Sequence, residues 1–154
     1  MLETIRCNCS TPTPYLKEWL PKLDLPKDSR IVDLGCGNGR NSKHIINCGF
    51  KNIKSFDLRG DYGAEANLLN GIPLHNKSAD FIVCNYLLCF MNNRERSFMA
   101  REIERIAAWN CYLMVELYNG KNAKPYVTEK VAELFQYWNV IHIVKDRFIL
   151  QRGR

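Results

Sequence analysis

Three glycines at alternate positions, Gly35, Gly37 and Gly39, stand between an apolar run and a helical pattern. Asp33 precedes the first of them by two residues, so that the local sequence reads D-L-G-C-G-N-G-R-N. Glycine permits positive φ and lets a ligand lie against bare backbone. The helix that follows offers unpaired N–H groups and the positive end of its dipole. This pattern predicts a cradle for a small molecule at the carboxyl edge of a parallel sheet.

The spacing of these glycines distinguishes two kinds of site. A dinucleotide site has the pattern G-x-G-x-x-G, but here Arg40 stands where its third glycine belongs. The string D-x-G-x-G-x-G instead resembles motif I of class I S-adenosylmethionine (SAM)-dependent methyltransferases. A nucleotide-binding Rossmann domain and a tight strand–turn–helix without a ligand are the alternatives that the motif leaves open.

A second acid, Asp57, ends the second predicted strand, 22 residues after Gly35. A carboxylate at the end of the second strand can accept hydrogen bonds from both hydroxyls of a ribose. In the methyltransferases that the chain resembles, the corresponding acid holds the SAM ribose, and the acid of motif I orients the glycine loop and the ammonium group. The resemblance also implies that residues 85–87 lie beside the methionine part of SAM, and that Ala66 and Asn67 read the adenine.

A narrower resemblance concerns the segments 37–42, 80–83 and 90–96, which are similar to those of tellurite-resistance methyltransferases. In that group Arg40 and Asn41 would lie close to the carboxylate end of SAM, where a guanidinium can form a forked pair. The cofactor-binding residues predicted in this way are Asp33, Gly35, Cys36, Gly37, Asn38, Gly39, Arg40, Asn41, Asp57, Leu58, Ala66, Asn67, Asn85, Tyr86 and Leu87.

The elements that must position these residues alternate along the chain. Hydrophobic periodicity predicts strands at 30–34, 52–57, 79–85 and 110–118, and helices at 39–48, 94–108 and 128–138. The runs 140–144 and 147–151 flank the pair Lys145-Asp146, which predicts an antiparallel hairpin. The alternation indicates an α/β fold, a Rossmann-like three-layer sandwich with a mostly parallel sheet and a C-terminal antiparallel hairpin. Residues 58–77 contain no clear helix, so the helix that normally follows the second strand is expected to be short or missing.

Several local expectations accompany this pattern. Residues 42, 45, 46 and 49 are expected to form the packed face of the first helix, with Gly49 as its C-terminal cap. Thr128 is expected to cap the last helix, whose packed face would be Val131, Leu134, Phe135 and Trp138. His75 is expected in a loop near the site, whereas His44 and His142 are expected to be solvated or structural.

The composition is that of a soluble globular domain of 154 residues with 46% hydrophobic and 25% charged residues. We expect a single domain, residues 1–154, with an N-terminal substrate or lid segment (1–27) and a SAM-binding core (28–151). No apolar run reaches the length of a membrane span. Seven cysteines, an odd number, favour reduced thiols in the cytoplasm. No metal is expected, although Cys7 and Cys9 form a C-x-C pair that could bind one.

The function expected from these residues is SAM-dependent methyl transfer to a small-molecule acceptor. The net charge of +6 keeps open a SAM-binding core that methylates RNA or protein with a partner, and a non-catalytic Rossmann-like nucleotide-binding module is the third alternative. Asn85 is followed by Tyr-Leu-Leu and not by the Pro-Pro-aromatic sequence of amino-methylating DNA enzymes, which argues against that activity. No residue declares itself a general base, and neither the acceptor nor the oligomeric state is predicted.

Overall fold

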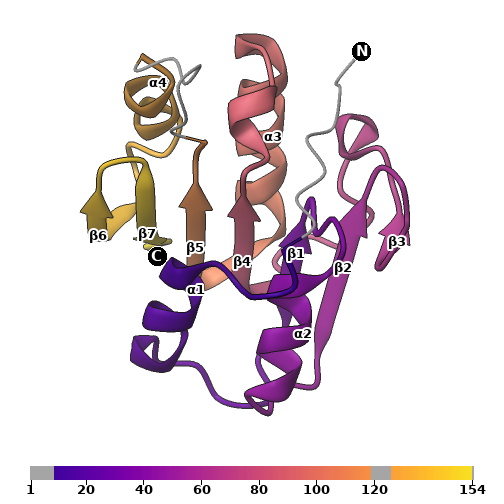
Figure 1. Cartoon of the computed structure of the whole chain (residues 1–154). Coiled ribbons are helices and arrows are strands. Elements are labelled where there is room, and N and C mark those ends of the chain that lie inside the picture. The colour runs from indigo at the N-terminus through magenta and orange to yellow at the C-terminus, as the bar shows by residue number, and fades with distance from the viewer. Residues whose placement is uncertain (1–8, 119–125, 154) are drawn as a thin grey trace.

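One seven-stranded sheet, in the order β3-β2-β1-β4-β5-β7-β6, forms the centre of the molecule (Figure 1). The computed structural model describes residues 9–118 and 126–153. Strands β1 to β5 are parallel to one another, and β7 is antiparallel to both β5 and β6. The strands are β1 (Ile31–Leu34), β2 (Ile53–Asp57), β3 (Ala64–Glu65), β4 (Ala79–Asn85), β5 (Ala107–Glu116), β6 (Asn139–Val144) and β7 (Arg147–Gln151).

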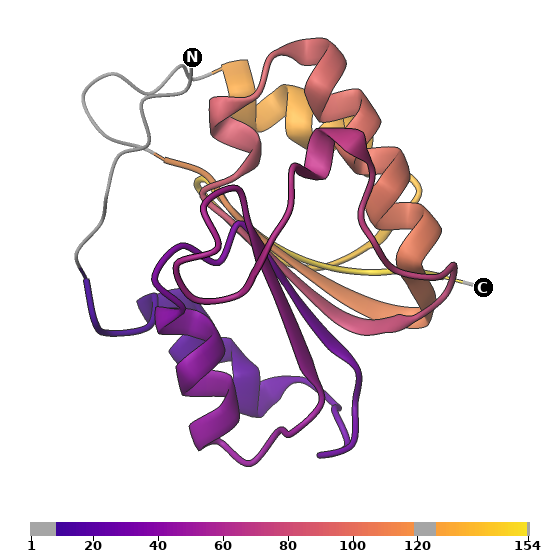
Figure 2. The ribbon, with the colours of Figure 1, turned by 90° about the vertical axis from the view of Figure 1, so that its right-hand side faces the viewer.

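Helices cover both faces of this sheet, α1 and α2 on one side and α3 and α4 on the other (Figure 2). Each face has its own hydrophobic core. Leu16, Ile45 and Phe81 belong to the first, and Ile103, Leu113 and Phe135 to the second. The helices are α1 (Pro14–Trp19), α2 (Arg40–Asn47), α3 (Asn93–Ile106) and α4 (Tyr126–Leu134), with short 3₁₀ turns η1 (Leu20–Lys22), η2 (Leu68–Asn70) and η3 (Leu88–Phe90). The predicted three-layer α/β sandwich with a terminal antiparallel hairpin is therefore confirmed.

The parallel strands give the sheet two different edges. The carboxyl ends of β1, β2, β4 and β5 lie along one of them, here called the carboxyl edge, and their amino ends lie along the other, the amino edge. All four residues of β1 are buried, as expected of a strand that is covered on both faces. The turns that follow the strands at the carboxyl edge hold most of the residues that the sequence singles out.

In place of a helix between β2 and β4 there is a loop that side chains of α3 hold by hydrogen bonds. Only the two-residue β3 and the turn η2 stand there, and Leu68 and Ile72 pack into the core beneath α3. Arg105 of α3 donates to the carbonyls of Ile72 (2.8 Å) and Leu74 (2.7 Å), and the carboxylate of Glu102 accepts from the backbone N–H of Ile72 (2.7 Å). Two side chains of α3 thus satisfy backbone groups that a helix would satisfy internally.

Four local predictions differ from the structure. β5 begins at Ala107 and not at 110, because Ala107 is already extended and pairs with Ala79. Thr128 lies inside α4 and its hydroxyl bonds the carboxylate of Asp146 (2.5 Å), so it does not cap the helix. α4 ends at Leu134, and Trp138 packs against Phe135 from the following turn with ring centroids 5.9 Å apart.

The fourth difference lies in α2, where Ile46 is 44% exposed. The buried residues of this helix are Asn41, Ser42 and Ile45. Ile46 follows Ile45 by one residue, which turns its side chain about 100° away from that face. The terminus of the helix is as expected, because Gly49 adopts a φ of 97° and donates its N–H to the carbonyl of Ile46.

The cysteines of the core behave as small apolar residues. Cys36, Cys84 and Cys111 are buried, and these three are free thiols, as are Cys48 and Cys89. Cys7 lies outside the described residues, as does most of the loop at 119–127, so the C-x-C pair stays untested. None of the described helices combines the length and the apolar character needed to cross a bilayer.

The first turn of α3 provides a test of the fold. The amide oxygen of Asn92 accepts from the N–H of Glu95, and the carboxylate of Glu95 accepts from the N–H of Asn92, both at 2.9 Å. Replacing Asn92 with Ala should lower the free energy of unfolding by about 1 kcal/mol, measured by urea denaturation. Arg94→Ala at an exposed position of the same turn should change it by less than about 0.5 kcal/mol, and equal losses in both variants would contradict the capping box.

Candidate active site

The glycine loop at the end of β1 is held by an unusual pair of hydrogen bonds. The N–H groups of Gly35 and Cys36 both donate to the carbonyl of Phe56 on β2, at 2.8 and 3.0 Å. Gly35, Gly37 and Gly39 adopt φ values of 71°, 54° and 81°, a region that other residues rarely enter. The loop therefore lies flat against the end of β2.

The three glycines do not serve the same purpose. A Cβ on Gly35 would lie 3.2 Å from Leu87, and one on Gly39 would lie 2.3 Å from the ring of Tyr62. A Cβ on Gly37 would meet no atom within 4 Å. Gly35 and Gly39 are thus required by packing, whereas Gly37 faces open space, which is where a ligand could lie against the backbone.

Asp57 borders this open space. One oxygen of its carboxylate accepts from the N–H of Gly37 (3.0 Å) and the other from the N–H of Arg59 (3.1 Å). Leu58, the next residue, is 54% exposed. The structure therefore brings the acid of the second strand and the glycine loop into direct contact, as the sequence predicts.

Asp33 lies at the end of β1 beneath the loop and is buried, with an exposed fraction of 2%. It accepts a hydrogen bond from the hydroxyl of Ser42 (2.6 Å), which also contacts the hydroxyl of Ser55 (2.8 Å). The pKa of Asp33 is raised to about 6, chiefly by burial and also by the charge of Asp57, while the hydrogen bond from Ser42 and the charge of Arg40 oppose the shift. Through Ser42, Asp33 connects β1 to α2 and β2.

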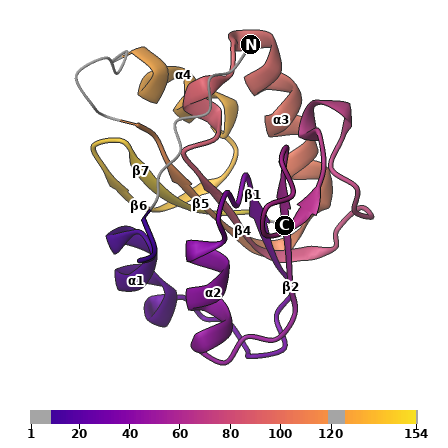
Figure 3. The same ribbon diagram turned by 45° about the vertical axis from the view of Figure 1, so that its right-hand side comes forward.

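Residues at the start of α2 connect the glycine loop to the N-terminal segment. The amide oxygen of Asn41 accepts from the backbone N–H of Thr13 (2.9 Å), and the amide of Asn38 donates to the carbonyl of Cys9 (2.9 Å). The guanidinium of Arg40 lies 5.9 Å from the centre of the ring of Tyr86. α1, which follows this segment, lies next to α2 on the same face of the sheet (Figure 3).

A buried polar network follows β4 and β5, and the sequence analysis missed its central member, Glu116. This residue is fully buried, and its carboxylate accepts from the amide of Asn85 (2.5 Å). The same amide nitrogen lies 3.3 Å from the hydroxyl of Thr13. The other carboxylate oxygen of Glu116 lies 3.4 Å from Nε of Arg147. The signal for Glu116 was available, since it is an acid at the end of an otherwise apolar strand.

Two atoms of this network have no hydrogen-bond partner among the described residues. They are the amide oxygen of Asn85 and Oε1 of Glu116, both buried. Burial raises the pKa of Glu116, while Thr13 and Arg147 lower it. Oε1 of Glu116 has the ion pair with Arg147 at 3.4 Å but no hydrogen bond. Buried acceptors without a hydrogen bond are costly, so this corner of the site has capacity for a ligand that donates hydrogen bonds.

Tyr86 and Leu87 complete the carboxyl edge. Tyr86 adopts a φ of 57° and donates its N–H to the carbonyl of Glu116 (2.7 Å). Strained backbone of this kind is concentrated at functional sites. Burial raises the pKa of the Tyr86 phenol, and the charge of Glu116 adds to the shift. Leu87 packs on Gly35 and so ties this segment to the glycine loop.

Of the residues predicted to read the adenine, Ala66 donates its N–H to the carbonyl of Asp57 (2.9 Å). Asn67 is exposed, and its amide oxygen caps η2 by accepting from Leu69. The prediction for His75 is wrong. It lies at the amino edge just before β4, because the chain must return to that edge before it can start a parallel strand.

His142 has a structural environment, as expected. Its Nδ1 lies 2.9 Å from the hydroxyl of Tyr15, and its ring centre lies 4.6 Å from that of Trp19. Tyr15 is buried in the core between α1 and the sheet, and Trp19 packs against the same core.

Comparison with known proteins supports the class of protein that this fold and site define. A family model for a methyltransferase domain matches residues 4–148. The chain therefore belongs to this family of methyltransferase domains. A search of curated proteins finds no significant match.

Solved structures share the fold at low sequence identity. A SAM-dependent methyltransferase from Aquifex aeolicus is 16% identical, with a TM-score of 0.68 over 88% of this chain and 87% of that one. A SAM-dependent methyltransferase from Methanosarcina mazei is 15% identical, with a TM-score of 0.67 over 93% of this chain and 99% of that one. The 1,6-didemethyltoxoflavin-N1-methyltransferase of Burkholderia thailandensis, solved with that compound and S-adenosylhomocysteine, is 9% identical, with a TM-score of 0.71 over 92% and 78%.

The prediction of a SAM-dependent methyltransferase is thus confirmed at the level of family, fold, enzyme class and cofactor. The narrower resemblance to tellurite-resistance methyltransferases, the individual cofactor-binding residues and the acceptor stay predictions.

Because Asp33 is buried, the free energy of unfolding should depend on pH in a way that can be tested. The folded protein keeps a proton on this carboxyl up to about pH 6, whereas the unfolded chain releases it near 3.8. The unfolded state therefore binds fewer protons between these values, and stability falls as the pH rises through them. Asp33→Asn should remove this loss and raise the free energy of unfolding at pH 7 by on the order of 2 kcal/mol.

The measurement is urea denaturation of both proteins from pH 4 to pH 7.5. The difference between the two curves of unfolding free energy against pH gives the contribution of Asp33 and leaves out that of other buried carboxyls. Asp61→Asn, at an exposed position of the neighbouring loop, should leave the curve unchanged. A variant with the same pH dependence as the original chain would show that Asp33 does not titrate in this window.

Proposed function

We propose that the chain binds SAM along the glycine loop, Asp57 and residues 85–87, and transfers its methyl group to a small-molecule acceptor. The observation that carries this proposal is the open space at Gly37, bordered by the carboxylate of Asp57. Side chains already pack against Gly35 and Gly39, its two neighbouring glycines. Of the three, Gly37 alone therefore has backbone that a ligand could contact.

The residues present fit the cofactor. The backbone of Gly37 would accept close approach, Asp57 would exchange its bond to Gly37 for bonds to ribose hydroxyls, and Arg40 could pair with a carboxylate. Asp33 beneath the loop offers negative charge near groups that are positive in SAM. Bound SAM supplies a methyl group that its sulfonium already activates, so the chain has to hold and orient the acceptor.

We propose further that residues 1–27 act as a substrate or lid segment over a core of residues 28–151. The support comes from Thr13, which is 1% exposed and contacts Asn41 of α2 and Asn85 of β4. One residue of the segment thus joins the glycine loop to the strand end that faces the acceptor. An acceptor would be enclosed by this segment and the carboxyl edge, which excludes water from the reaction.

Glu116 is the residue best suited to handle a proton of the acceptor. Its Oε1 lacks a hydrogen bond, its second oxygen is held by Asn85, and its pKa is raised by burial. A carboxylate with these properties can accept a proton from an N–H or O–H acceptor. Asn85, with its own unpaired oxygen, would accept a second hydrogen bond and orient the acceptor.

A small acceptor is favoured by the enclosure of this corner and by the didemethyltoxoflavin bound in one structural neighbour. Methylation of RNA or protein with a partner is the second candidate, and the net charge of +6 is the observation in its favour. A cytoplasmic location stays a proposal that rests on the free cysteines.

Gly37→Asn tests the cofactor site. Asparagine tolerates positive φ, so the fold should persist while its side chain occupies the open space. SAM affinity, measured by calorimetric titration, should fall at least about tenfold. Gly49→Asn is the matched control, since Gly49 has a φ of 97° at the other end of α2 and only the side chain of Lys27 within 4 Å. Equal affinities in the two variants would refute the assignment.

Glu116→Gln tests the acceptor side. SAM should bind with unchanged affinity, while methylation of an N–H or O–H acceptor found by screening heterocycles and phenols should slow by about 10²- to 10⁴-fold. A thioether or tertiary amine carries no proton on the attacked atom, and its methylation should keep its rate. Equal losses with both kinds of acceptor would mean that Glu116 only supports the fold of the site.

A further inference from the structure

A hollow lies at the amino edge of the sheet, opposite the glycine loop. It has a volume of about 340 Å³. Strand β4 separates the two places, and its seven residues span roughly 20 Å at about 3.3 Å each. The residues that line the hollow come from three distant parts of the chain and are mostly cationic: Asn76, Lys77, Arg101, Glu104, Arg105 and Arg152.

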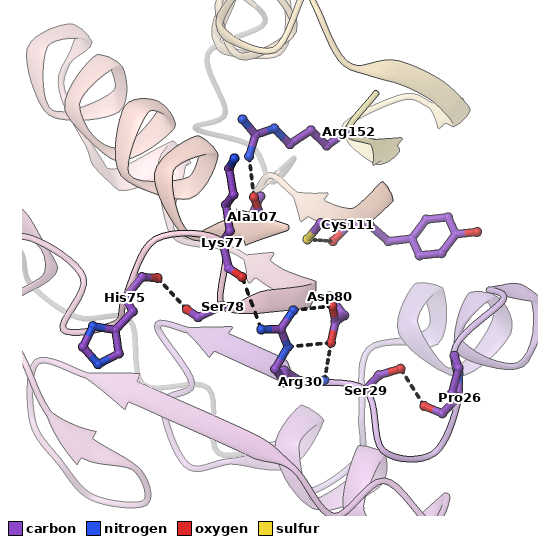
Figure 4. Close-up of polar contacts among 11 residues, drawn as sticks. Pro26, Ser29, Arg30, His75, Lys77, Ser78, Asp80, Ala107, Cys111 and Arg152 are labelled. Atoms are coloured by element: carbon purple, nitrogen blue, oxygen red, sulfur yellow. Dashed lines mark hydrogen bonds and ion pairs between the residues drawn. The ribbon is translucent and has the colours of Figure 1, made fainter. Parts of the chain in front are cut away.

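Part of this positive charge has a structural use. Arg105 pairs with Glu102 (2.8 Å) and bonds three further groups, so its donors are occupied. Arg152 donates to the carbonyls of Glu104 and Ala107 at the end of α3. Arg30, next to the hollow, is neutralised by a two-pronged pair with Asp80 at 2.8 and 2.9 Å (Figure 4).

Much of this charge, including that of Arg152, is not paired with a carboxylate within the described residues. Lys77, Arg101 and Arg152 form no ion pair there, and Glu104 is the one carboxylate that lines the hollow. The carboxyl end of α3 adds about half a negative charge from its dipole. Three unpaired cations exceed what this helix end and Glu104 offset together.

Trp109 holds two of these cations in place. Its ring is 49% exposed, with Nζ of Lys77 4.4 Å and Cζ of Arg152 4.6 Å from its centre. Lys77 extends toward Arg152 from the turn before β4 (Figure 4). Packing against an aromatic ring restricts long cationic side chains, so less freedom is lost when an anion binds between them.

We propose that this hollow binds a phosphate group. A guanidinium offers paired donors to phosphate oxygens and an ammonium offers a mobile charge, and the structure puts both beside an amide, Asn76. The site is separate from methyl transfer, and its ligand is either a free or terminal phosphate or the phosphodiester backbone of an oligonucleotide.

The experiment is a titration of the full chain with pyrophosphate, followed by tryptophan fluorescence. Binding should saturate and change the emission of Trp109, because its two cations engage the ligand. Trp109→Phe should remove that signal, which excludes Trp19 and Trp138 as its source. A signal that survives in this variant would overturn the proposal.

The decisive variant carries Lys77→Asn with Arg101→Gln. Asparagine suits the left-handed backbone of position 77, where φ is 53°, and Arg101 is exposed on α3. Affinity for pyrophosphate should fall at least tenfold while SAM binding is unchanged. The matched control pairs Arg94→Gln with Lys43→Gln and removes the same charge from α3 and α2 outside the hollow. Equal losses in both double variants, or no saturable binding, would overturn the proposal.

Competition then identifies the source of the phosphate. Adenosine monophosphate carries a terminal phosphate, and a short single-stranded RNA without terminal phosphates carries only phosphodiesters. Displacement of pyrophosphate by the first alone supports a small phosphorylated ligand. Displacement by the RNA supports a backbone site, with affinity that falls steeply as salt increases.

Discussion

The carbonyl of Phe56 accepts two backbone hydrogen bonds, from Gly35 and Cys36, and the rest of the site depends on this contact. It presses the glycine loop against the end of β2, which brings the N–H of Gly37 to the carboxylate of Asp57. The close approach requires positive φ at Gly35 and leaves room for Leu87 on its other side. A side chain at Gly35 would press on Leu87 and separate β1 from the segment after β4, so the loop and the acceptor corner are positioned by the same few atoms.

The sequence predicted short motifs and the regular alternation of strands and helices. The glycine spacing, the acid that ends β2 and the hairpin at Lys145-Asp146 each follow from neighbouring residues, and the alternation of strands and helices then implies the parallel sheet. Besides the local differences in β5, α4 and α2, the errors concern long-range placement. His75 was expected near the glycine loop but lies at the other edge. Glu116 becomes part of the site only because β5 pairs with β4, where Asn85 stands opposite it.

Two buried carboxyls, Asp33 and Glu116, set the character of the carboxyl edge. Each loses free energy on burial, which raises its pKa, and each is only partly compensated by hydrogen bonds to Ser42 or Asn85. A fold selected for stability alone would replace them with apolar residues. Their presence under and beside the open backbone of Gly37 is understandable if a bound molecule with positive charge and hydrogen-bond donors completes their surroundings.

The two edges of the sheet therefore differ in charge for a physical reason. The carboxyl edge places the acids Asp33, Asp57 and Glu116 around the open space at Gly37, which suits a cationic, nucleoside-containing ligand. At the amino edge, the end of α3 presents carbonyls, which attract Arg152 and leave Lys77 and Arg101 unbalanced beside it. A ligand that is drawn to one edge is repelled by the charges of the other. Since roughly 20 Å of β4 lies between them, each edge can be altered by substitution without changing the other.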